Sequence, residues 1–203
     1  MLDGGVAAPD KRTLPTKLGG DGWESFNHEH FDDMNYNQIL SNFKDLTKGI
    51  KDGLGYYAKN MMNEKQLGDG IGEIFHAVQD FYSHSNYVEL YAEVYGKTKI
   101  SDIPTLQEAI ASGGKSDATI QEKKFAKLLK NNLKTGKYPG DGHGTHKEMN
   151  HDLGKGGAPF SILPEVIDKE VDWYSQAAEE VATKATTEIN DNVEKVIDKK
   201  IKK

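Results

Sequence analysis

The sequence of 203 residues contains no cysteine, which excludes disulfide bonds, thiolate nucleophiles and cysteine-ligated zinc sites. Histidine and carboxylate side chains are therefore the ionisable groups left to bind a metal. No apolar run approaches the length of a membrane span, and residues 1–9 lack the charged and apolar regions of a signal peptide. The net charge of −6 predicts no binding to duplex nucleic acid through the overall field of the chain.

With only six prolines and 36% hydrophobic residues, the composition indicates one folded globular domain. Residues 1–22 lack periodic hydrophobics and predict an extended arm, followed by a helical domain over residues 23–203. Apolar residues recur at intervals of three and four residues, without strand-like alternation. The predicted fold is therefore an all-α, single-domain helical bundle, with a long metal-bearing loop over residues 136–161. The expected helices cover residues 35–62, 66–95 with a bend at Ser85-Asn86, 104–112, 117–135 and a long stretch from residue 164.

His76, Asp80 and His84 recur at steps of four in a helix-compatible run, so one helical face carries three potential metal ligands. The two histidines are roughly 12 Å apart along the helix axis, too far to share one ion comfortably. Asp80 lies between them and has two oxygens, which suits a carboxylate that bridges two metal ions. The competing interpretation is a helix whose polar face happens to include these three residues.

The other five histidines form two further clusters, at His28 and His30 and between residues 143 and 151. We favour metal binding for His30 and leave His28 and Asp33 open, since Asp32 or Asp33 would also suit a helix N-cap. The later cluster offers three imidazoles and two carboxylates, of which at most two or three would bind a metal directly.

Lysines follow the apolar stripe of the predicted helix over residues 117–135. A solvated face is one interpretation, and a contact with anionic lipid or another acidic partner is the other. The lysines are Lys123, Lys124, Lys127, Lys130 and Lys134.

Together, the run from His76 to Asn86, the segment His30-Phe31-Asp32 and the pair Thr145-His146 resemble the Het-C-like branch of the zinc-dependent phospholipase C and single-strand nuclease superfamily. The resemblance extends roughly from Phe26 through the last helix. It implies an all-α fold with two or three zinc ions.

When the site residues of that superfamily are carried over by position, Asp80 resembles the carboxylate that bridges two zinc ions, and four histidines resemble zinc ligands. A carboxylate near His146 would be Glu148 or Asp152, with Asp152 preferred, and an aspartate acting with the first metal would be Asp10 or Asp21. The four histidines are His30, His76, His84 and His146.

The resemblance also implies a function, the hydrolysis of phosphodiesters by zinc-activated water, with phospholipid preferred over nucleic acid as substrate. Membrane contact, secretion or export, a toxin-effector role and a cognate inhibitor protein are further expectations. The alternative is a non-catalytic interaction module of a larger secreted or toxin protein, in which metal only joins the loop to the bundle. A metal phosphohydrolase built on His151-Asp152 would leave the row at His76, Asp80 and His84 unexplained.

Overall fold

The computed structural model describes residues 31–136 and 169–201, and these two segments contain six α-helices, one short 3-10 helix and no β-strand. The predicted all-α, single-domain fold is confirmed. The predicted arm and nearly all of the predicted metal-bearing loop lie outside the described residues. The elements are α5 (Tyr36–Ala58), α6 (Glu64–Ser83), α7 (Tyr87–Tyr95), η2 (Ile100–Asp102), α8 (Leu106–Gly113), α9 (Ile120–Asn132) and α10 (Lys169–Ile201).

Four of these helices begin with a capping box that can be read from the sequence. In each, the side chain of the N-cap residue accepts a backbone N–H of the first turn, and the side chain three residues later accepts the N-cap N–H. Such a cap contributes about 1 kcal/mol to helix stability. The competing interpretation of Asp32 or Asp33 as a helix N-cap does not hold for α5, whose N-cap residue is Asn35. The pairs are Asn35 with Gln38, Asn63 with Gln66, Thr105 with Glu108, and Thr119 with Glu122.

Residues 66–95 do not form the single bent helix that the sequence predicted, because α6 ends at Ser83 and α7 starts at Tyr87. The segment that follows α9 supplies the backbone partners of this break. Gly136 N donates to the carbonyl oxygen of His84 at 2.8 Å, and Lys134 N donates to Oδ1 of Asn86 at 3.0 Å. These long-range hydrogen bonds replace helical ones, so tertiary contacts end α6.

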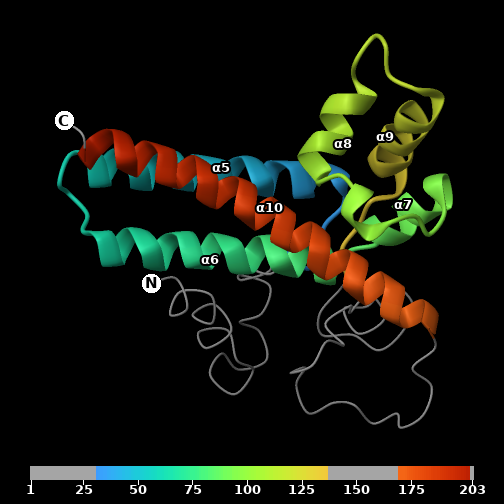
Figure 1. Ribbon diagram of the computed structural model, residues 1–203, viewed down its shortest axis with the longest axis horizontal. Coiled ribbons are helices and arrows are strands. Elements are labelled where there is room, and N and C mark those ends of the chain that lie inside the picture. Colours follow the sequence, from blue (N-terminus) through green and yellow to red (C-terminus); the bar gives the residue numbers. More distant parts are fainter. Residues whose placement is uncertain (1–30, 137–168, 202–203) are drawn as a thin grey trace, which may run out of the picture.

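The long helices α5, α6 and α10 lie together at one end of the molecule, and α7, α8 and α9 lie at the other (Figure 1). Helix α10 runs along both parts and packs most extensively against α6. Among the described helices, none is long and apolar enough to cross a membrane.

An unbroken chain of aromatic rings forms the centre of the core where these two parts meet. Phe81 of α6 lies 5.3 Å from Phe31 and 5.1 Å from Phe43, measured between ring centroids. Tyr82 continues the chain to Tyr87 at 5.4 Å. Of these five rings, four are fully buried and Phe43 is 8% exposed. Burial of this much apolar surface is the main stabilising contribution to the fold.

A close approach between α8 and α9 requires glycine at position 113. A Cβ atom on Gly113 would lie 2.3 Å from the Cβ of Ala126 and 3.0 Å from the backbone oxygen of Glu122. We therefore expect Gly113→Ala to lower the free energy of unfolding by about 1–3 kcal/mol, because the two helices must move apart. Urea denaturation would measure this change.

The matched control for that variant is Gly55→Ala in α5, where no atom lies within 4 Å of the added Cβ. There the better helix propensity of alanine should raise the free energy of unfolding by about 0.5–1 kcal/mol. Equal effects of the two substitutions would show that helix propensity, and not the α8–α9 contact, determines the result.

Candidate functional site

The row formed by His76, Asp80 and His84 is placed by the second half of α6, where His84 is the C-cap residue. Its three side chains come together as the four-residue spacing predicts. His76 Nε2 lies 3.3 Å from Oδ2 of Asp80, and His84 Nε2 lies 3.9 Å from Oδ1. Each imidazole therefore faces a different oxygen of the same carboxylate.

This His-Asp-His row is largely buried. The side chains of His76 and His84 are 8% and 5% exposed, and that of Asp80 is 15% exposed. The neighbours Phe81 and Tyr82 on α6 belong to the fully buried aromatic core. A carboxylate in such surroundings is stabilised by partners that offer positive charge or hydrogen-bond donors. The separations of 3.3 Å and 3.9 Å are ion-pair contacts and not hydrogen bonds, so each imidazole attracts the carboxylate only when it is protonated.

The zinc prediction was tested against the donor set of this row. Two ligands on one tetrahedral zinc ion lie about 3.3 Å apart when each bond is about 2.0–2.1 Å, and the His76–Asp80 separation matches that value. Within residues 31–136 and 169–201, however, no three His, Asp or Glu side chains form a group that could hold one ion. Each Asp80 oxygen has only one imidazole of the row beside it, so a complete site would need additional ligands.

The remaining predicted site residues come from the segment that precedes the described residues and from the segment between their two parts. Asp21, His30, His146 and Asp152 lie outside the described residues, as do the alternatives Asp10 and Glu148. Their roles, and zinc itself, therefore stay predictions.

The segment from Leu133 to Gly136 adjoins the row and was missed by sequence reasoning. Besides the hydrogen bond from Gly136 to His84, Thr135 N donates to the carbonyl oxygen of Met34, and Thr135 Oγ1 accepts from Met34 N. The segment thus ties the start of α5 to the end of α6. No local sequence signal marks it, since its partners lie far away along the chain.

Fold and site together define a class, an all-α domain with a buried His-Asp-His row on its central helix. The family model described as the VWA7 N-terminal domain matches residues 16–119, which is half of the chain. The chain belongs to this family. Searches of curated proteins and of solved structures gave no match.

This family assignment corrects the resemblance drawn from the sequence. The matching family is the VWA7 N-terminal domain, so the assignment to the Het-C-like branch of the phospholipase C and nuclease superfamily is wrong. The interpretation as a phosphodiester hydrolase or toxin effector is wrong with it, since it depended on that branch and on a metal centre that the described residues do not form. The row had been correctly placed on one helix, but four-residue spacing is also compatible with a structural role.

Proposed function

We propose that this chain is a non-catalytic binding domain of a larger protein. The observation that carries the proposal is the match of residues 16–119 to a family described as an N-terminal domain. Such a domain works through the surfaces it presents to other molecules and to the rest of its own protein. Burial of the row supports the proposal, because little of either imidazole is exposed to a molecule in solution.

In this proposal the row has a structural task. Asp80 on α6 holds two imidazoles, and Gly136 binds the backbone of His84 at the end of that helix. The hydrogen bond from Gly136 to His84 favours one packing arrangement, because any other leaves these two backbone groups without it. The row would therefore fix how α6 meets the segment that follows α9, and so keep the binding surfaces in place.

The test is Asp80→Asn, which keeps the shape of the side chain but removes its charge. We expect the free energy of unfolding to fall by about 1–3 kcal/mol, because two buried imidazoles lose the negative charge beside them. The control is Asp69→Asn on the exposed side of α6, where Asp69 pairs with Lys65 at 2.6 Å. That exposed pair is worth less than about 1 kcal/mol.

Both variants and the native chain would also be assayed with bis(p-nitrophenyl) phosphate and a single-stranded oligonucleotide, with zinc added. No turnover is expected in any of the three. Turnover that requires zinc and is lost in Asp80→Asn alone would overturn the proposal. Elemental analysis of the same samples checks the zinc prediction separately, since zinc that falls in Asp80→Asn without any turnover would indicate a structural metal. Secretion and an inhibitor protein stay predictions.

A further inference from the structure

Two chemically different faces run along α9. Phe125 and Leu129 are buried in the core, and Leu133 directly after the helix is also buried. Successive residues turn by about 100°, so the opposite side of the helix carries one isoleucine and four lysines. We call this side the α9 basic face; it consists of Ile120, Lys123, Lys124, Lys127 and Lys130.

Ile120 stands out among the apolar residues of the described segments because 88% of it is exposed, more than Met61 at 69% or Tyr56 at 48%. All four lysines beside it are exposed as well. An isoleucine fully presented to water costs free energy that burial against a partner would recover. The α9 basic face therefore combines a positive charge with one apolar contact point.

The charge of this region differs in sign from that of the whole chain. Residues 115–134 contain six lysines and two acidic residues, whereas the chain has a net charge of −6. One of these acidic residues, Glu122, is committed to the N-cap of α9, where it accepts hydrogen bonds from N and Oγ1 of Thr119 at 2.7 Å. It lies on the core side of the helix and does not interrupt the α9 basic face.

Three lysines elsewhere on the surface are paired with carboxylates. Lys65 lies 2.6 Å from Asp69, Lys184 lies 2.6 Å from Glu108, and Lys48 pairs with Asp52. In the part of the chain that the structure describes, no carboxylate lies within 4.0 Å of the four lysines of the α9 basic face. Apart from the neighbouring charge of Glu122, their positive field is screened by solvent and salt.

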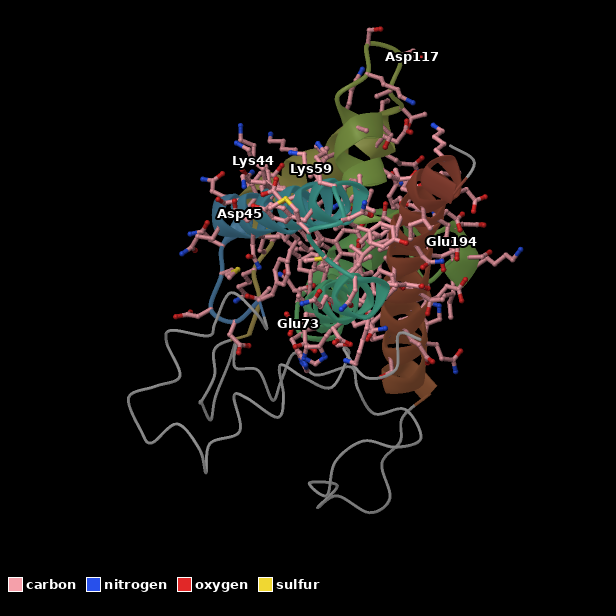
Figure 2. The ribbon with its side chains drawn as sticks, turned by 90° about the vertical axis from the view of Figure 1, so that its left-hand side faces the viewer. Lys44, Asp45, Lys59, Glu73, Asp117 and Glu194 are labelled. Atoms are coloured by element: carbon pink, nitrogen blue, oxygen red, sulfur yellow. The ribbon has the colours of Figure 1, made fainter. Side chains whose placement is uncertain are left out.

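The position of α9 makes the face accessible to a large, extended partner. Helices α8 and α9 project from the long bundle of α5, α6 and α10 (Figure 1). Asp117, in the connection that leads into α9, lies at the far tip of this projection (Figure 2). Ile120 comes three residues later, so the apolar contact point lies toward the protruding end.

We propose that the α9 basic face docks the domain on an anionic lipid surface. This proposal rests on the proposed function of the chain as a non-catalytic binding domain. The face contains only lysine, a flexible point charge suited to a diffuse negative surface, and no arginine for bidentate recognition. It also lacks the tryptophan, tyrosine and arginine that dominate the energetic centres of protein interfaces. Ile120 enters the headgroup region while the lysines neutralise lipid charge.

The test is co-sedimentation of the full chain with phosphatidylcholine vesicles that contain about 30% phosphatidylserine, against vesicles of phosphatidylcholine alone. Each lysine near such a surface strengthens binding about five-fold, so Lys124→Gln with Lys127→Gln should weaken it on the order of 25-fold. The matched control is Lys48→Gln with Lys65→Gln, which changes net charge equally at lysines that already have carboxylate partners. The control should lose no more than about three-fold. Adding Ile120→Ser to the Lys124→Gln, Lys127→Gln variant should weaken binding to the anionic vesicles further.

Equal losses in the two double variants, or equal binding to both kinds of vesicle, would overturn the docking proposal. Binding to poly-glutamate without binding to anionic vesicles would also overturn it and indicate an acidic protein partner. Circular dichroism of each variant confirms that the substitutions leave the fold intact. Products of lipid hydrolysis, measured on the same vesicles, would refute the non-catalytic role without affecting the docking result.

Discussion

Phe81→Ala should lower the free energy of unfolding by about 3–5 kcal/mol, a large part of the stability of a domain of this size. The ring of Phe81 is fully buried and touches rings from three other parts of the chain. Its centroid lies 5.1 Å from Phe43 on α5 and 6.1 Å from Tyr87 on α7. Removing it opens a cavity that these rings cannot fill by small movements.

Urea denaturation followed by circular dichroism measures this loss. Tyr56→Ala on α5 is the control, because its ring is 48% exposed and its removal should cost less than about 1 kcal/mol. A loss below about 1 kcal/mol in Phe81→Ala as well would mean that the aromatic chain does not form the core in solution.

Alkaline pH should unfold the domain through two buried tyrosines. Burial raises the pKa of Tyr82 and of Tyr87 above the ordinary value of 10.0. Below pH 10 both states hold these protons, so the stability contributed is fully present. Above it the unfolded chain loses protons first, and stability falls by about 1.4 kcal/mol per pH unit for each tyrosine. For the two phenols together this slope approaches about 2.7 kcal/mol per pH unit.

The measurement is a series of urea denaturation curves between about pH 9 and pH 11.5, with tyrosinate absorbance followed in parallel. Tyr87→Phe should lower the slope of stability against pH by about 1.4 kcal/mol per pH unit. It also removes the hydrogen bond of 2.7 Å from Tyr87 Oη to the carbonyl oxygen of Pro104. Tyr56→Phe is the exposed control and should leave the slope unchanged. Ionisation of all tyrosines before unfolding would show that neither phenol is buried in solution.

The positions of the helices were predictable, to within a few residues at each end, where the apolar periodicity was regular. Helix α9 was expected over residues 117–135 and begins at Ile120, directly after the capping box of Thr119 and Glu122. Helix α8 was expected over residues 104–112 and ends at Gly113. The errors arose where distant segments meet, as at Asn86, because hydrogen bonds from Lys134 cannot be foreseen from spacing along the chain.

The candidate site shows the same division. Steps of four along α6 were enough to predict that His76, Asp80 and His84 share one side of a helix, because helical geometry is local. The same spacing did not determine what the row does. A metal centre needs ligands from several segments, whereas a structural role needs only the two imidazoles and the carboxylate between them. The local sequence is the same in both cases. The family assignment corrected this interpretation.

The sequence by itself determined the all-α class, the apolar stripe and lysines of α9 and the row on α6, since each depends on residues a few positions apart. Only the tertiary structure decided that α6 and α7 are separate helices, that Phe31, Phe43 and Phe81 meet in one core, and that Ile120 stays exposed. Those features depend on which surfaces of distant segments pack together. Periodicity shows that a helix has an apolar face, but the partner of that face is set by the packing of the whole chain.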